Sequence, residues 1–192
     1  MTLSVRFAPV LALAVGLAIS ASAWAAPATW VVDKAASKLA FRSGYSGEPF
    51  EGRFGRWDAQ IQFDPAQLAA SKAVVTVDIA SATTGDGTKD EYLPSDDWFS
   101  TRKFPTATFA TRAIKSLGGN RYQAEGDLTL KGVSRPVTLP FTLAINGDVA
   151  RMNGQVSLNR TVFGVGQGEF KSAETVPFDV VVVVDLTARR KP

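Results

Sequence analysis

The sequence predicts an all-β protein: an extended antiparallel up-and-down barrel of about eight strands with a short helical insertion. Most segments after residue 26 alternate apolar and polar residues with a period of two, as strands with one dry face do. The predicted strands are long and are separated by short turn sequences. Four glycines within residues 44–55 permit the curvature that barrel closure needs. A β-sandwich is the alternative, and strand length and these glycines favour the barrel.

Residues 1–25 have the features of a secretory signal peptide. A lone arginine precedes an apolar run over residues 7–19, and the small residues Ala23-x-Ala25 offer a cleavage site. The apolar run is shorter than the roughly 20 residues that span a bilayer, which disfavours an uncleaved anchor. We therefore expect cleavage after residue 25 or 26, export to the periplasm, and a single domain over residues 26–192.

The first half of the domain is predicted to contain several short strands. They cover residues 30–32, 39–43, a bent or bulged pair within 44–55, 57–63 and 73–80. Alternation places Leu39, Phe41 and Ser43 on one face of the second of these strands. It likewise places Trp57, Ala59, Ile61 and Phe63 on one face. Asp64-Pro65 ends that strand, and residues 66–70 are predicted to form a helical turn.

The alternation stops between Thr84 and Ser100. This polar segment predicts one or two short helices, with Ser95 as the N-cap of the second. Strands resume after Phe104-Pro105, at residues 106–114, 122–130, 133–145, 152–158 and 176–187. Turn sequences at residues 117–120, 131–132 and 146–148 separate four of them.

The composition excludes several classes of protein. The chain has no cysteine, so disulfides and redox-thiol chemistry are excluded. It has no histidine, so a Ser-His-Asp constellation cannot be built and common zinc sites lose their favoured ligands. The net charge is +3, but the sequence lacks the cluster of basic residues that nucleic-acid-binding proteins have. We therefore expect no enzymatic activity, no covalent cofactor, no metal site and no nucleic-acid partner.

Two further motifs receive a structural interpretation. The acids Asp86, Asp90, Glu91, Asp96 and Asp97 lack the spacing of a calcium loop and are predicted to be solvated or helix-capping. The glycines at 164, 166 and 168 do not match a dinucleotide-binding fingerprint. Glu169 stands where its third glycine belongs, and no βαβ unit surrounds the segment. We interpret them as a flexible bend.

The apolar interior is what remains as a functional feature. Either its side chains fill a solid core, or they surround a cavity, since a barrel of about eight strands can enclose one small ligand. Phe178 and Val182 are also expected on its dry faces. The candidate ligand-binding residues are Phe41, Phe54, Trp57, Phe63, Val77, Leu93, Trp98, Phe109, Leu128, Phe141 and Leu143.

Residues 29–187 resemble the YceI-like family of periplasmic polyisoprenoid-binding proteins. Four segments carry much of the resemblance: Trp30-Val31-Val32-Asp33, Ile61-x-Phe63-Asp64-Pro65, Leu93-Pro94-Ser95-Asp96-Asp97-Trp98-Phe99, and the run from Gly126 to Phe141. The resemblance implies a lipocalin-like barrel whose tunnel holds an isoprenoid, such as a polyprenyl lipid or the tail of a quinone. Ala36 stands where many members have histidine, and Gly44-Tyr45 occupies the region of a second one. Any polar contact of those histidines is therefore absent.

The resemblance also suggests a partner, because many similar sequences accompany membrane proteins of the cytochrome b561 type. A second hypothesis follows, in which the protein docks on a membrane b-type cytochrome without a ligand of its own. It supposes that Trp98 and Phe99 are exposed on the helical insertion. The sequence leaves open whether two copies of the chain form a homodimer.

Overall fold

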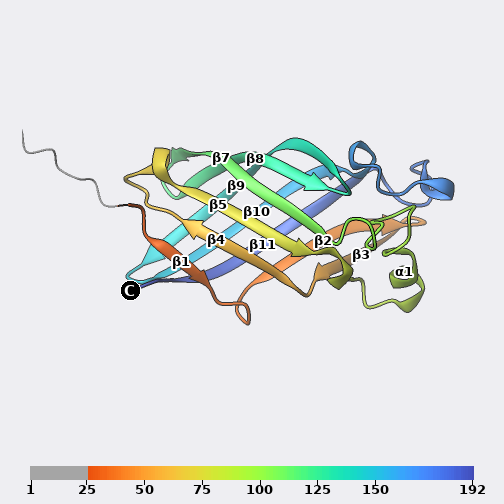
Figure 1. The fold of residues 1–192 in the computed structure, drawn as a ribbon, viewed down its shortest axis with the longest axis horizontal. Helices are drawn as coiled ribbons and strands as arrows, with labels where there is room; N and C mark the ends of the chain where they lie inside the picture. Colours follow the sequence, from red (N-terminus) through yellow and green to blue (C-terminus); the bar gives the residue numbers. More distant parts are fainter. Residues whose placement is uncertain (1–25) are drawn as a thin grey trace, which may run out of the picture.

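The computed structural model describes residues 26–192 as one elongated β-barrel (Figure 1). The predicted signal peptide lies outside the described residues. The strands are β1 (Thr29–Val32), β2 (Lys38–Tyr45), β3 (Glu48–Phe54), β4 (Trp57–Gln62), β5 (Lys72–Asp78), β6 (Ala82–Thr83), β7 (Thr106–Gly118), β8 (Arg121–Leu130), β9 (Val133–Asn146), β10 (Val149–Asn159) and β11 (Asp179–Arg190). Within residues 26–192 the only α-helix is α1 (Gly87–Tyr92), and four 3₁₀ turns lie at Leu68–Ala70, Ile79–Ser81, Arg160–Phe163 and Gly168–Phe170.

The sheet closes on itself through β11. One edge of β11 pairs with β10 along its whole length. The other edge pairs with β1 near Arg190 and with β2 around Val182. β1 and β2 therefore act as one interrupted barrel strand, and β3 and β4, which follow each other across Gly55, act as another. With β5 and β7 to β11 they form a closed antiparallel barrel of eight strands, which confirms the predicted fold class.

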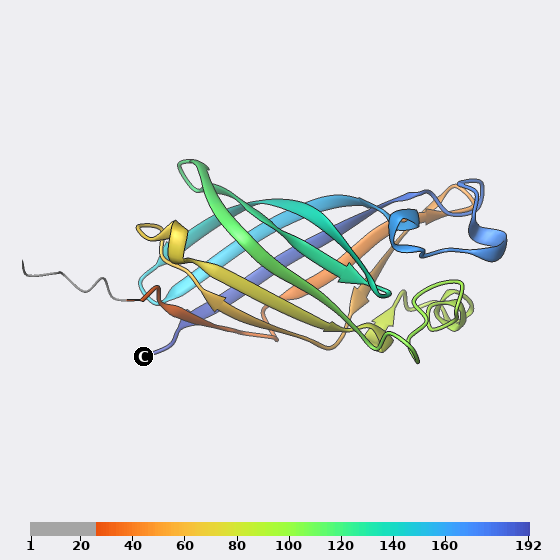
Figure 2. The ribbon, with the colours of Figure 1, turned by 45° about the horizontal axis from the view of Figure 1, so that its top comes forward.

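The two ends of the barrel differ. At the end near the C-terminus, the Trp30 indole donates a hydrogen bond to the carbonyl oxygen of Phe63 at 2.9 Å. Tyr122 packs there between the rings of Phe63 and Phe141. The opposite end, which we call the loop end, consists of residues 84–105, residues 160–178 and the β2–β3 hairpin (Figure 2). Loop and hairpin meet where Ser46 N donates to Thr175 O at 2.8 Å.

Most predicted strands are confirmed within a few residues, and the helical turn after Asp64-Pro65 is a 3₁₀ turn. The β8–β9 turn is also confirmed, since Lys131 and Gly132 both have the positive φ of a tight hairpin turn. The last strand begins at Asp179, later than predicted. Phe178 is therefore not on a dry face but 37% exposed in the preceding loop, where the Arg160 guanidinium lies over its ring.

Of the one or two helices predicted in the insertion, one forms, and the N-cap role of Ser95 is wrong. Residues 93–99 form successive turns, and the Ser95 hydroxyl caps nothing. The Ser95 carbonyl instead accepts hydrogen bonds from Trp98 N and Ser100 N, and Phe99 N donates to Leu93 O. The backbone thus curls on itself, and this curl turns Trp98 and Phe99 toward the barrel. The helix that does form is capped by Asp86, whose carboxylate accepts from Thr88 N and Lys89 N.

Candidate functional site

The barrel encloses an apolar cavity, which we call the barrel chamber. Its empty volume, including space open to solvent, is about 1520 Å³. Side chains from β1 to β5 and from β7 to β11 line it, and no polar atom is exposed to the space.

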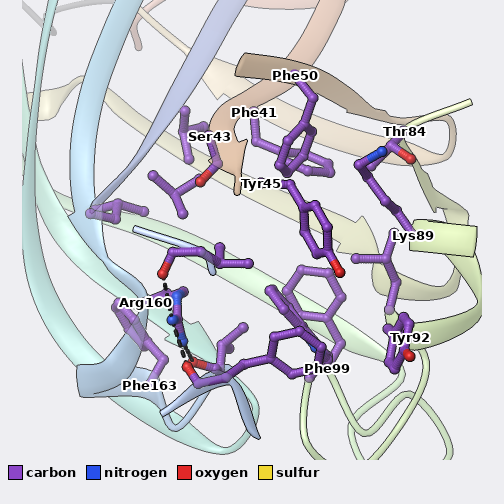
Figure 3. Close-up of a pocket in the computed structure, with 18 of the residues that line it drawn as sticks. Phe41, Ser43, Tyr45, Phe50, Thr84, Lys89, Tyr92, Phe99, Arg160 and Phe163 are labelled. Atoms are coloured by element: carbon purple, nitrogen blue, oxygen red, sulfur yellow. Dashed lines mark hydrogen bonds between the residues drawn. The ribbon is translucent and has the colours of Figure 1, made fainter. Parts of the chain in front are cut away.

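A second chamber continues the first at the loop end. This loop-end chamber has an empty volume of about 920 Å³, again including space open to solvent, and its lining is almost entirely carbon. Figure 3 shows the rings of Phe41, Phe50 and Phe99 around it. The two chambers adjoin each other, since they have five lining residues in common: Phe54, Phe99, Leu130, Leu158 and Val182.

The inward-facing side chains are not packed as in a solid core. Along β9 the side chains of Val137, Leu139, Phe141 and Leu143 point inward, and each keeps part of its surface free. In residues 26–192 no large side chain is completely buried. Protein cores normally interdigitate with few voids, so this incomplete burial means that the interior is hollow.

Ten of the eleven candidate residues line this cavity. Phe63, Val77, Phe109, Leu128, Phe141 and Leu143 line the barrel chamber; Phe41, Leu93 and Trp98 line the loop-end chamber; Phe54 lines both. Trp57 lines neither chamber. Its ring lies 3.7 Å from the Lys34 ammonium, which covers it. Alternation along β4 predicted an inward Trp57 together with Ile61 and Phe63, and only the latter two reach the cavity.

The supposed exposure of Trp98 and Phe99 is wrong. Phe99 is only 9% exposed and lies between the two chambers. Trp98 is half-buried, and its ring packs edge-on against Phe170 with a centroid separation of 5.2 Å. The docking hypothesis for a membrane cytochrome therefore loses one of its two supports, and the family resemblance is the other.

Arg160 is the main site residue that the sequence analysis missed. It is 4% exposed and lines the loop-end chamber, and among residues 26–192 it has no carboxylate partner. Its guanidinium donates to six carbonyl oxygens, those of Pro177, Val165, Gly166, Phe170, Ser172 and Val176, at 2.7–3.3 Å. Desolvation lowers the pKa of Arg160. No periodicity or spacing could indicate this role, because the acceptors are backbone groups of a loop without a repeating pattern.

The Arg160 contacts correct the interpretation of the glycines that follow it. Gly164, Gly166 and Gly168 all have positive φ, and a Cβ atom on Gly166 would overlap the Arg160 guanidinium. The segment is thus a shaped loop wrapped around a buried cation, and not merely a flexible bend. Lys131 joins it to the insertion by donating to Gly164 O at 2.6 Å and to Asp96 O at 2.7 Å.

The charged groups around the cavity belong to the fold. Asp86 caps α1 and forms an ion pair with Lys89, while Asp90 accepts hydrogen bonds from Thr83 and Thr84. Within residues 26–192, no three acidic side chains come together as a metal site would require. In the same residues, no helix is long and apolar enough to cross a bilayer.

A closed antiparallel barrel with an apolar interior cavity defines a class of proteins that bind hydrophobic molecules in their interior. Within that class, the chain belongs to the YceI-like family, whose domain model matches residues 30–188.

Relatives and solved structures agree with this assignment. A UPF0312 protein of Pseudomonas savastanoi pv. phaseolicola is 33% identical over 178 residues, covering 88% of this chain and 92% of that protein. BcnA of Burkholderia cenocepacia has a TM-score of 0.78 at 38% identity, covering 81% of this chain and 98% of BcnA. A polyisoprenoid-binding domain from Saccharophagus degradans, implicated in plant cell wall breakdown, shares the fold, with a TM-score of 0.65 at 16% identity over 85% of this chain and 99% of that domain.

Proposed function

We propose that this protein is an exported binding protein, not an enzyme, that holds an isoprenoid lipid in its cavity. The ligand would be a polyprenyl lipid or a prenylated quinone. The observation that carries the proposal is the hollow interior, in which inward-facing side chains of the strands remain partly uncovered.

The physical case rests on the free energy gained when an apolar chain leaves water for an apolar cavity. Each methylene that moves from water into such a space contributes about 0.8 kcal/mol. A long prenyl chain fits apolar chambers that adjoin between the barrel and the loop end, because the chain itself makes no hydrogen bonds. Membership of the YceI-like family and the fold shared with a polyisoprenoid-binding domain support this class of ligand.

The first test is to identify what the protein carries. Protein purified without detergent would be extracted with organic solvent, and the extract analysed by mass spectrometry. We expect an isoprenoid in near-stoichiometric amount. Repeated recovery of no lipid, together with no binding of added polyprenols or prenylated quinones, would refute the proposal.

The second test fills the cavity. Val156 on β10 lines the barrel chamber, whereas its neighbour Ser157 points to solvent. Val156→Trp should occupy the space of the ligand and lower its affinity at least tenfold, with the fold retained because the new ring enters a void. The matched control is Ser157→Trp, which adds the same ring outside the barrel and should bind as the unmodified protein does. Equal affinities for the two variants would show that the ligand does not use this chamber.

We also propose that the protein acts in the periplasm after removal of residues 1–25, as the composition of that segment suggests. Cell fractionation and mass analysis of the mature N-terminus would test this. A mature chain that still begins at Met1 in the cytoplasmic fraction would contradict it.

A further inference from the structure

We infer that the ligand enters and leaves the cavity through a seam between the β2–β3 hairpin and the helix α1, and that α1 is the lid over this passage. The inference rests on the proposed function, because a carrier must load and unload its ligand, but it applies to any apolar molecule that the cavity takes.

The end of the barrel near the C-terminus is closed by packed aromatic side chains. Trp30 is 3% exposed there, its indole is bonded to the Phe63 carbonyl, and the Arg190 guanidinium lies over its ring at 5.0 Å from the centroid. Tyr122 packs edge-on against the Phe63 ring. A ligand would have to break this cluster to pass, so the passage is to be sought at the loop end.

At the loop end the wall of strands has a gap between β3 and β8. β5 and β7 pair no further than Asp78 and Thr106, and β6 pairs with only two residues of β3. In the described part of the chain, the outer edge of β3 from Glu48 to Gly52 therefore has no neighbouring strand. Residues 84–105 cover the gap instead (Figure 2). Whether this cover can open depends on its contacts with the segments beside it.

Two of the three seams between the loop-end segments are closed by backbone hydrogen bonds. Gly166 N and Gln167 N both donate to Asp97 O at 2.8 Å, which joins the β10–β11 loop to the insertion. Ser46 N donates to Thr175 O, which joins the same loop to the hairpin. The β10–β11 loop is thus held on both sides.

The third seam, between the hairpin and α1, is not closed in this way. Within residues 26–192, no hydrogen bond or ion pair joins residues 42–52 to residues 84–105. One contact across the seam is the Lys89 ammonium, 5.5 Å from the centre of the Tyr45 ring, which is a weak interaction at an exposed site. Tyr45 and Tyr92 both line the loop-end chamber and are 38% and 42% exposed. The chamber therefore comes to the surface at this seam (Figure 3).

The helix α1 lies between a flexible point and an anchored one. Gly85 precedes the helix with a φ of 76°, and no atom lies near the position that a Cβ would take, so the backbone is free to turn there. After the helix, Leu93 and Phe99 are buried and fix the chain to the barrel. The helix can swing outward while residues 93–100 stay in place.

Few contacts hold the helix closed. The Asp90 carboxylate accepts hydrogen bonds from the Thr83 hydroxyl and from Thr84 N, and so ties the helix to the end of β6. The Tyr92 ring meets the Phe170 ring edge-on at 5.3 Å. Segments with so few buried contacts open at a small free-energy cost, as a lid must.

The first test closes the seam with a covalent link. The chain has no cysteine, so Tyr45→Cys combined with Lys89→Cys can be joined specifically by a short, reducible methanethiosulfonate cross-linker. The probe is N-phenylnaphthylamine, an uncharged fluorophore whose emission rises in apolar surroundings, and stopped flow follows its entry and release. The cross-link should slow both rates about tenfold or more, and reductant should restore them. The control pair is Asp97→Cys with Gln167→Cys, which spans a seam that is already bonded and should leave the rates unchanged.

The second test loosens the lid. Asp90→Ala removes the acceptor that ties α1 to Thr83 and Thr84, and we expect release of the probe to become about three- to tenfold faster. Glu91→Ala is the control, because it removes an exposed carboxylate from the same helix and should release the probe as the unmodified protein does.

The outcomes separate this inference from the proposed function. Equal rates before and after reduction of the Tyr45–Lys89 cross-link would overturn the inference, and so would an equal slowing by the control cross-link. Unmodified rates in Asp90→Ala would overturn the role of α1 as the lid. A probe that cannot enter the unmodified protein would also overturn the inference. If the probe behaves as expected but polyprenols and prenylated quinones do not bind, the proposed function fails and the passage stands.

Discussion

Phe41 on β2 lies directly across from Gly52 on β3. Its ring covers the glycine, and a Cβ atom at position 52 would overlap it. The ring is held in this position by Phe54 and Phe50, at centroid separations of 5.2 and 6.4 Å. The missing side chain at Gly52 therefore allows Phe41 to lie flat in the wall of the loop-end chamber.

Gly52→Val tests this contact. The added side chain must displace a ring that is packed on both sides, and overpacking of this kind costs about 1–3 kcal/mol. We expect a loss of that size in the free energy of unfolding, measured by urea titration. Gly55→Ala is the control, because its Cβ would have no neighbour closer than 3.6 Å. If the two variants were equally stable, the overlap with Phe41 would not be the cause.

The loop between β10 and β11 contains two short 3₁₀ turns, and its shape depends on one side chain. Backbone carbonyls from residues 165–177 converge on the Arg160 guanidinium, which lies between the rings of Trp98 and Phe178. The planar fork of arginine can satisfy many acceptors at once, whereas a lysine ammonium has only three donors on a flexible stem. The loop end of the cavity is therefore built around this residue.

Arg160→Lys should consequently destabilise the loop although the charge is kept. Several carbonyls would lose their donor, and we expect a loss of about 3 kcal/mol or more in the free energy of unfolding. Hydrogen exchange of amides in residues 160–178 should rise more than that of the barrel strands. The comparison is Arg112→Lys, an exposed residue 3.5 Å from Asp127, which should change stability by less than about 1 kcal/mol. Wild-type exchange rates in the Arg160→Lys loop would contradict this role.

At the scale of the whole molecule, a closed sheet surrounds space that its own side chains do not fill. Phe141 represents this wall, since it stacks on Tyr122 at 5.5 Å and also faces the barrel chamber. In a solid core the loss of such a ring leaves a new cavity, but here part of its surroundings is already empty.

Phe141→Ala therefore distinguishes a ligand cavity from a core. Removal of a fully packed phenylalanine costs about 3–5 kcal/mol. We expect the lipid-free variant to lose distinctly less than this in chemical unfolding, while its affinity for an isoprenoid falls. Both quantities would be measured on the same preparation. A large loss of stability with unchanged lipid retention would show that Phe141 belongs to the core and not to a site.

The sequence by itself determined the fold class and most strand positions, and ten of its eleven candidate residues line the cavity. Alternation of apolar residues indicates which side of a strand faces inward, and glycine and asparagine turns indicate where strands end. That information is local. It placed Phe63, Phe109 and Phe141 correctly and failed at Trp57, where the Lys34 side chain covers the ring.

Only the tertiary structure decided whether the interior is filled or hollow, because filling depends on what stands opposite each side chain across the barrel. The same reason explains Arg160, whose acceptors are set by the path of a loop, and Trp98, which an irregular curl of the insertion turns inward. The sequence thus determined most of the strands that form the wall of the barrel. The closure of the sheet decided the empty space within it.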